Sequence, residues 1–349
     1  MKVAVIGAGV VGRLTALSLL NQGTQVSLFE KSELTSNHNA AFVSAGMISP
    51  ISESAHAHPE VVDLGFKSLS LWPKILQRMA EYDPLGRDVY FRDDGSLVVA
   101  SAHEQPGLQQ FHYDIKSKLA TRDVDIKPLT NAQINDIEPD IKNSHSAFLL
   151  QPEAQLCNRS FLTASTRVLL EECHSISQQQ LTVSKIKKLQ DSFDYVVDCR
   201  GEGAIDKETI QQDIGPLRGV RGEVIRVHCP DVSLNRFIRV IHPRHPIYIV
   251  PKPNSTFVVG ATEVESKSTH PITVRSTLEL LNTLYSINPA FAEATILESH
   301  VGVRAAYLDN APSVLKKGNL ISANGLYRHG WLTGPAISQK IVNHIQESN

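Results

Sequence analysis

The sequence is poor in cysteine and in long apolar runs. Its 349 residues include four cysteines, Cys157, Cys173, Cys199 and Cys229, with no CxxC pair among them. This spacing excludes a zinc ribbon and a disulfide-rich scaffold, so free thiols are expected. No stretch approaches the roughly 18–20 consecutive apolar residues of a membrane span. We therefore expect a cytoplasmic chain.

An excess of charge of either sign is also missing. Lys and Arg total 34 and Asp and Glu total 36, which gives a formal charge of −2, and no block of basic residues occurs. Clustered cations carry most binding to nucleic acids and to anionic membranes, so neither is expected as a partner. Hydrophobic residues make up 42%, as in a folded globular chain with a sizeable core. The length favours two domains, and a small molecule is the expected partner.

The first thirty residues predict a strand, a helix and a second strand. Residues 2–6 form a short β-branched run, residues 13–20 carry apolar side chains at helical spacing, and residues 25–29 (QVSLF) are typical of a second strand. Three glycines and Arg13 interrupt the apolar start of the chain, which is more typical of this unit than of a signal peptide. A β-α-β unit is therefore expected at the start of the chain.

A G-x-G-x-x-G motif lies in the turn between the first strand and the helix. Gly7 would allow the tight turn, Gly9 a close approach of a diphosphate, and Gly12 close packing of helix on strand. The helix N-terminus would offer N–H groups and a positive dipole end to that diphosphate. Glu30 follows Gly12 by 18 residues, where a carboxylate can accept hydrogen bonds from a ribose. The motif predicts a dinucleotide, without deciding between FAD and NAD.

The rest of the chain alternates between helical and antiparallel patterns. We expect the fold class to be α/β and α+β, with a Rossmann-like nucleotide-binding domain made of separate segments and an inserted antiparallel-sheet domain. Helices are predicted at residues 61–80 (with a break at Pro73), 160–170, 277–284 and 336–345, strands at 96–100, 194–199 and 319–323, antiparallel strands between 222 and 260, and an exposed strand edge at Lys185–Lys188.

The turn Asn324–Gly330 lies between the last predicted strand and the closing helix. A helix N-terminus at this place can face the pyrimidine edge of a flavin and stabilise the negative charge of the reduced ring. A nicotinamide cofactor has no such need. An ordinary loop before a surface helix is the alternative reading of the same residues.

Several motifs, taken together and in this order, resemble the D-amino-acid oxidase superfamily of FAD-dependent oxidoreductases, and within it the glycine oxidases of thiamine biosynthesis. The resemblance extends over nearly the whole chain. The motifs that carry it are Gly7–Gly12, Glu30, Ser44–Met47, Arg221–Glu223, Tyr248–Pro251, Val259–Thr262, Gly302–Arg304 and Asn324–Gly330.

The resemblance implies noncovalent FAD in a discontinuous domain of residues 1–80, 142–208 and 305–349. A substrate domain of residues 81–141 and 209–304 would complete the fold. The FAD contacts carried over by the resemblance, with the motif glycines, are Gly7, Gly9, Val10, Val11, Gly12, Glu30, Lys31, Ala40, Ala41, Ala45, Gly46, Met47, Val183, Leu326, Tyr327, Arg328, His329, Gly330, Trp331 and Leu332.

The resemblance also implies that the substrate is a small amino acid and that Tyr248, Arg304 and Arg328 bind it. Glycine or a similar amino acid would be oxidised to the imine by hydride transfer to flavin N5. Dioxygen would then reoxidise the flavin and give hydrogen peroxide, and the imine would serve thiamine thiazole synthesis. A homo-oligomer is expected. The alternatives are a D-amino-acid or N-methylamino-acid oxidase or dehydrogenase, and a flavin-binding maturation partner without turnover of its own.

Residue chemistry bears on the role of Arg304 and on two pairs of histidines. A planar guanidinium binds a carboxylate through two parallel hydrogen bonds, which favours Arg304 as the substrate anchor over a structural salt bridge. The histidine pairs His56 and His58, and His242 and His245, lack a matched Cys or carboxylate. They are expected to be solvated loop residues, and no metal site is predicted.

Overall fold

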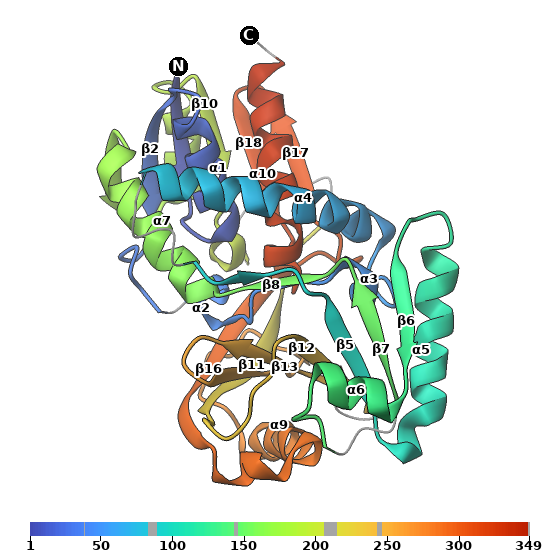
Figure 1. Ribbon diagram of the computed structural model, residues 1–349. Helices are drawn as coiled ribbons and strands as arrows, with labels where there is room; N and C mark the ends of the chain where they lie inside the picture. Colours follow the sequence, from blue (N-terminus) through green and yellow to red (C-terminus); the bar gives the residue numbers. More distant parts are fainter. Residues whose placement is uncertain (38, 83–88, 143–145, 206–214, 243–245, 348–349) are drawn as a thin grey trace.

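The computed structural model describes residues 1–37, 39–82, 89–142, 146–205, 215–242 and 246–347. A mainly parallel sheet with its helices forms one half of the molecule, and a larger, mostly antiparallel sheet forms the other (Figure 1). Both ends of the chain lie on the side of the parallel sheet. Among the described residues, no helix is long and apolar enough to cross a membrane.

The parallel sheet has six strands, and the first strand of the chain is one of the two in its middle. β1 pairs in parallel with both β2 and β10, β10 pairs in parallel with β18, and only β17 runs antiparallel. This confirms the predicted β-α-β unit and the assembly of the sheet from distant segments. In sheet order the strands are β17 Ser313–Lys317, β18 Leu320–Asn324, β10 Tyr195–Asp198, β1 Lys2–Ile6, β2 Gln25–Glu30 and β9 Ser175–Gln178.

Long helices pack on this sheet and on one another, and β1 and β2 are buried between layers. The apolar side chains of these helices and strands form the largest core cluster, which includes Trp72, Phe161 and Trp331 from the helices. The helices are α1 Val10–Leu20, α4 Pro59–Tyr82, α7 Asn158–Glu172 and α10 Gly330–Gln346, with the short helices α2 Ala40–Val43, α3 Pro50–Glu53 and α8 Val183–Leu189 and the 3₁₀ turn η3 Gly201–Ala204.

The second sheet has nine strands and is mostly antiparallel, as expected for the inserted part. Its longest strands, β11 and β16, pair along their length, and one side of the sheet is covered by α9 (Figure 1). In sheet order the strands are β15 Val264–Glu265, β11 Arg218–His228, β14 Thr256–Gly260, β13 Ile247–Lys252, β12 Phe237–Val240, β5 Ser96–Ala100, β7 Ser146–Gln151 and β6 Asp125–Leu129, with β16 Thr295–Ala306 on β11.

A small three-stranded sheet lies where the two halves meet. β8 pairs with β3 on one side and with β4 on the other, and β3 carries Met47. These strands are β3 Met47–Ile48, β8 Ala154–Leu156 and β4 Phe91–Arg92. The remaining elements are α5 Gln105–Lys118, α6 Asn131–Ile137, α9 Val274–Ile287 and the 3₁₀ turns η2 Ala102–Glu104 and η5 Pro289–Glu293.

The expected nucleotide-binding segment of residues 142–208 begins with β7. This strand pairs with β5 and β6 in the nine-stranded sheet and not with the parallel sheet. The expected boundary at residues 208 and 209 falls outside the described residues.

Two helix predictions also need correction. Helix α4 is not broken at Pro73, and α10 begins at Gly330, six residues before the predicted start. Pro335 deprives the carbonyl of Trp331 of its helical donor. The indole N–H of Trp72 donates to that oxygen at 3.1 Å, so the helix continues through the proline.

The segment Lys185–Lys188 forms part of a helix and not of a strand edge. The side chain of Thr182 accepts a hydrogen bond from the backbone N–H of Lys185 and caps helix α8. Ile186 is buried, and the lysines on either side of it are exposed. One buried position in a polar run fits the predicted strand as well as this short helix, so the pattern alone did not separate them.

Candidate functional site

The glycine turn between β1 and α1 is built as the motif predicts. A Cβ on Gly7, whose φ is +95°, would lie 2.6 Å from the carbonyl oxygen of Cys199 on the neighbouring strand. A Cβ on Gly12 would lie 1.8 Å from the carbonyl oxygen of Gly7. At Gly9 a Cβ would meet no atom within 4 Å, because that side of the turn opens into a pocket. The turn therefore leaves space beside the first N–H groups of α1.

We call this space the nucleotide pocket; it lies between Gly9, Glu30, Ala40 and Tyr327. The carboxylate of Glu30 closes one side and accepts hydrogen bonds from the backbone N–H groups of Ala8 at 2.5 Å and of Lys31 at 2.7 Å. These bonds fix the carboxylate at the end of β2, where the motif places the ribose. Predicted contact residues that line the pocket are Gly7, Gly9, Val10, Val11, Glu30, Lys31, Ala40, Ala41, Leu326, Tyr327 and Gly330.

The C-terminal turn reaches the nucleotide pocket from the opposite end of the chain. Tyr327, with a φ of +52°, donates its backbone N–H to the carbonyl of Ala305 at 3.0 Å. Just beyond it, the indole of Trp331 donates to the hydroxyl of Ser44 at 2.6 Å. The N-terminus of α10 is thereby joined to the segment that follows β2. The first and last turns of the chain thus enclose one space.

A second pocket, which we call the arginine pocket, adjoins the first and lies between Met47, Glu53, Tyr248, Arg239 and Arg304. Predicted residues that line it are Ala45, Gly46, Met47, Tyr248, His329 and Leu332. Residues that line both pockets are Ala40, Ser44, Arg304, Arg328 and Trp331.

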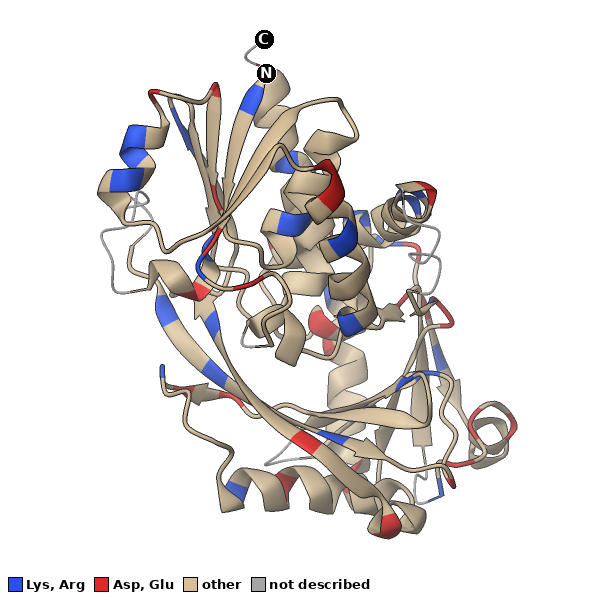
Figure 2. Ribbon diagram, turned by 90° about the vertical axis from the view of Figure 1, so that its left-hand side faces the viewer, with Lys and Arg blue, Asp and Glu red and all other residues tan. Residues whose placement is uncertain are grey.

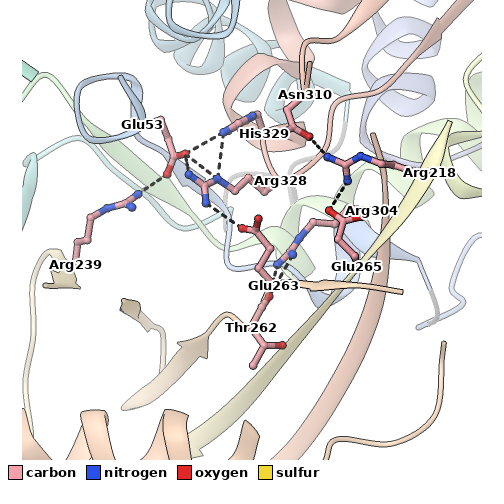
Figure 3. Close-up of polar contacts among 10 residues, drawn as sticks. All are labelled: Glu53, Arg218, Arg239, Thr262, Glu263, Glu265, Arg304, Asn310, Arg328 and His329. Carbon is pink, nitrogen blue, oxygen red and sulfur yellow. Dashed lines mark hydrogen bonds and ion pairs between the residues drawn. The ribbon is translucent and has the colours of Figure 1, made fainter. Parts of the chain in front are cut away.

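Arg304 lies on β16 at the junction of the two pockets. Its guanidinium donates to the carbonyl of Thr262 at 3.2 and 3.3 Å, and no carboxylate contact to it is found within the described part of the chain (Figure 3). A Cβ on Gly222 would lie 2.2 Å from Nη2 of Arg304. Gly222 is therefore the residue that lets the guanidinium lie across the sheet.

The Arg221–Glu223 motif holds Thr262 in place. Glu223 is 1% exposed and accepts hydrogen bonds from the Arg221 guanidinium at 3.1 Å and from the Thr262 hydroxyl at 2.7 Å. Its own backbone N–H donates to the same hydroxyl. The motif thus acts on Arg304 indirectly, because it fixes the carbonyl to which Arg304 donates.

Tyr248 lies on β13 and faces the arginine pocket. Burial raises the pKa of its phenol above the usual value, while Arg304, Arg328 and Arg239 act in the opposite direction. The phenol is therefore protonated at neutral pH and can donate a hydrogen bond to an acid group beside Arg304.

Arg328 and His329 converge on Glu53, a buried carboxylate that sequence reasoning did not single out. Its Oε2 lies 2.8 Å from Nη2 of Arg328 and 2.9 Å from Nε2 of His329, and Arg239 pairs with Oε1 (Figure 3). Burial alone would raise the pKa of Glu53, but Arg328, Arg239 and His329 hold it well below its ordinary value. Burial lowers the pKa of His329, so its imidazole is neutral.

The pairing with Glu53 changes the expected role of Arg328. Its guanidinium also lies 3.4 Å from Glu263, so two carboxylates surround it. Arg304, in contrast, contacts a carbonyl. Both arginines line both pockets, and the charge of Arg304 is less compensated by contacts among the described residues than that of Arg328.

Two predicted contact residues line neither pocket. Gly12 packs α1 against the turn, in agreement with its role in the motif. Val183 begins α8, and the neighbouring Leu181 instead lines a small adjoining pocket with Arg200. Sequence reasoning missed Arg200, Glu202 and Asn39 in the nucleotide pocket. No local motif marks them, because they come from separate loops.

The histidine pairs are only partly as expected. Both His58 and His56 are exposed to solvent. His56 also lines the arginine pocket, where partial desolvation by the pocket wall and the charge of Arg328 lower its pKa. His242 is half-buried, and His245 lies outside the described residues. Within the described ranges no group of three or more His, Cys, Asp or Glu side chains could hold a metal ion.

The model of the family described as "DAO: FAD dependent oxidoreductase" matches residues 2–343. The chain belongs to this family. The DAO family match covers both ends of the chain, which is consistent with a site built from the first and last turns. FAD is the cofactor, and the glycine turn, the fixed carboxylate of Glu30 and the N-terminus of α10 are suited to its diphosphate, ribose and flavin.

Individual DAO-type relatives match along nearly the whole chain. A Rhizobium etli protein named thiamine biosynthesis oxidoreductase ThiO is 35% identical over 99% of this chain and 96% of its own length. A glycine oxidase of Geobacillus kaustophilus is 23% identical over 99% of this chain and 92% of its own length.

Solved structures of this type share the fold. The crystal structure of the Geobacillus kaustophilus glycine oxidase has a TM-score of 0.83 at 20% identity, covering 99% of this chain and 95% of that one. An iminodiacetate oxidase of Chelativorans sp. has a TM-score of 0.81 at 20% identity over the same shares of the two chains. The predicted fold class is thereby confirmed.

Proposed function

We propose that this protein oxidises glycine, or a similarly small amino acid, to the imine and that the imine supplies thiazole synthesis in thiamine biosynthesis. The proposal is supported by relatives named ThiO and glycine oxidase, which match 99% of the chain. Reaction in the cytoplasm, with dioxygen as electron acceptor and in a homo-oligomer, belongs to the same proposal.

The position of Arg304 carries the proposal. Its guanidinium lies between the two pockets, is held by a carbonyl, and has Tyr248 near it. A substrate carboxylate there would gain two parallel hydrogen bonds from Arg304 and a third from the phenol. Those bonds would place the α-carbon at the opening to the nucleotide pocket. We assign Arg304 and Tyr248 to substrate binding.

Arg328 would act mainly by shaping the pocket. Because Glu53 and Glu263 already face its guanidinium, Arg328 would close the pocket while adding little net charge. When bound, FAD supplies the acceptor for a hydride from the α-carbon at flavin N5, and passes the electrons to dioxygen to give hydrogen peroxide. The chain itself need only orient a substrate with a neutral amine, which is catalysis by positioning and electrostatics.

The division into domains is part of the same proposal. Residues 1–80 and 305–349, with a central segment that begins after β7, would bind FAD. The remaining residues, including β7, would form the substrate domain. β16 would join the two domains, since it pairs with β11 along its length in the nine-stranded sheet and Arg304, near its end, lines the nucleotide pocket.

Anaerobic mixing of the FAD-loaded protein with glycine tests the function. Bleaching of the visible absorbance of the oxidised flavin is the expected result. Bleaching only by D-alanine or only by sarcosine would favour a D-amino-acid or an N-methylamino-acid enzyme. Absence of bleaching with every amine would favour a flavin-binding partner without turnover.

A further inference from the structure

Arg13 is a buried cation directly behind the glycine turn. It is the fourth residue of α1 and only 1% exposed. Its Nε donates to the carbonyl of Ala8, within the turn, at 2.8 Å. Its Nη2 donates to the carbonyl of Leu34, in the segment between β2 and α2, at 2.6 Å. One guanidinium therefore joins the two chain segments that flank the nucleotide pocket.

The third nitrogen of the same guanidinium, Nη1, contacts α7. Nη1 donates to the carbonyl of Leu162 at 3.2 Å, to the hydroxyl of Ser165 at 3.0 Å and to that of Thr166 at 2.8 Å. All five contacts found for Arg13 in the described part of the chain go to neutral oxygens. Its hydrogen bonds are satisfied, but its charge is not neutralised by them.

The other buried arginines of the described chain are paired differently. Arg221 pairs with the buried carboxylate of Glu223, and Nε of Arg226 lies 3.2 Å from Oε1 of Glu298. Burial lowers the pKa of Arg13 to about 10, while the more distant Glu30 opposes that change. Arg13 is therefore still a cation at neutral pH, in a place where an unpaired charge is costly.

A ligand with negative charge would remove that cost. The open side of Gly9 and the N-terminal N–H groups of α1 face the nucleotide pocket, and an FAD diphosphate carries two negative charges. We propose that Arg13 is a positioning residue for FAD: its buried charge offsets the diphosphate from behind the glycine turn, without touching it. The same fork of N–H groups holds the two flanks of the pocket at a fixed separation.

This inference concerns the cofactor and is independent of the substrate. It predicts that the charge of residue 13 matters more to FAD binding than its hydrogen bonds do. Arg13→Gln removes the charge and keeps a polar side chain. Arg13→Lys keeps the charge but loses the planar guanidinium and its branched set of N–H donors. Thr166→Val is a matched control, because it removes one acceptor of the guanidinium and leaves the charge in place.

Two measurements, the affinity for FAD and the midpoint of thermal unfolding, distinguish an effect of the Arg13 charge from a purely structural role of this side chain. FAD is titrated into flavin-stripped protein, and quenching of flavin fluorescence gives the dissociation constant. We expect Arg13→Gln to weaken FAD at least about tenfold, and Arg13→Lys and Thr166→Val to stay within about threefold of the natural chain. The thermal unfolding midpoint of FAD-loaded protein exceeds that of stripped protein by some difference, the midpoint gap. This gap should shrink for Arg13→Gln, because the stripped variant no longer buries an uncompensated charge.

Three results would overturn the proposal. They are equal weakening of FAD by Gln and Lys, unchanged affinity in Arg13→Gln, and an equal fall of both midpoints with the gap preserved. If Arg13→Gln does not fold, Arg13→Lys decides alone: a loss of FAD affinity of about tenfold or more would show that the charge is not what matters.

Discussion

The carboxylate of Glu53 lies 2.8 Å from Nη2 of Arg328, although 275 residues separate them in the chain. Arg239 and His329 share the same carboxylate. This cluster joins α3, β12 and the C-terminal turn, so it connects the nine-stranded sheet with the end of the chain. Glu53 is nearly inaccessible to solvent, and removal of its charge would leave the guanidinium groups of Arg328 and Arg239 without the carboxylate that they share.

We expect Glu53→Gln to lower the free energy of unfolding by about 3–5 kcal/mol, the scale for removing one partner of a buried ion pair. Urea denaturation of the FAD-loaded protein measures it. Asp63→Asn is the control, because Asp63 pairs with Arg122 in solvent and its loss should cost at most about 1 kcal/mol. Equal losses in the two variants would show that the cluster contributes no more than a surface pair.

Arg304→Leu tests the substrate anchor. The loss of one partner of a desolvated charge pair should cost roughly 2–5 kcal/mol in substrate binding, seen as a large rise in KM or in the substrate concentration for half-maximal flavin bleaching. FAD content should be retained. Arg218→Leu, which removes an arginine of β11 that pairs with the exposed Glu265, should leave KM near its original value. Unchanged glycine turnover in Arg304→Leu would refute the assignment.

Gly222→Ala should impair the same step without altering a charge. The new Cβ would lie 2.2 Å from Nη2 of Arg304 and only 2.4 Å from its Cζ, so the guanidinium must move off the Thr262 carbonyl. We expect substrate affinity to fall by at least about tenfold, that is by about 1.4 kcal/mol, with FAD still bound. Gly219→Ala is the control on the same strand, since its Cβ would chiefly meet the flexible side chain of Lys267.

Glu153 predicts a pH dependence of stability. Burial raises the pKa of this carboxyl to about 7, against the effect of hydrogen bonds from Ser52 and Ser96. An unfolded glutamate releases its proton near pH 4.3. The folded state is therefore favoured most below about pH 4, and this contribution is lost as the pH rises towards 7.

Glu153→Gln should remove that dependence, because the amide does not ionise in this range. The free energy of unfolding of the variant minus that of the natural chain should rise between about pH 4 and pH 7 and then level off. Urea denaturation at several pH values measures this difference. A difference that stays constant across the range would show that Glu153 ionises in the folded protein as it does in the unfolded chain.

Local features of the site were predictable from the sequence, and distant pairings were not. Gly7, Gly9, Gly12 and Glu30 could be placed because strand, turn and helix follow one another within thirty residues. The ends of β16 and β18 could be placed only by the resemblance to a family, since no rule of spacing brings Arg304 to the glycine turn. Glu53 carries no local signal at all, because its partners lie on strands and turns far along the chain.

Two of the predictions that failed concern helices, and each failure has a specific physical cause. Lys185–Lys188 forms a helix because Thr182 caps it, and one buried isoleucine in a lysine run could not distinguish a strand from a helical turn. Helix α10 extends towards the cofactor through Pro335 because a tryptophan on another helix satisfies the freed carbonyl. Such rescue by a residue 259 positions away is outside the reach of propensity rules.

The order of the strands has a consequence for synthesis of the protein. β1 at the start of the chain needs β10 beside it, and β10 needs β18, which ends at Asn324. The turn that completes the nucleotide pocket follows immediately after that strand. A nascent chain on the ribosome can therefore form its glycine turn early, but it gains a complete place for the flavin only after β18 and the turn that follows it have emerged.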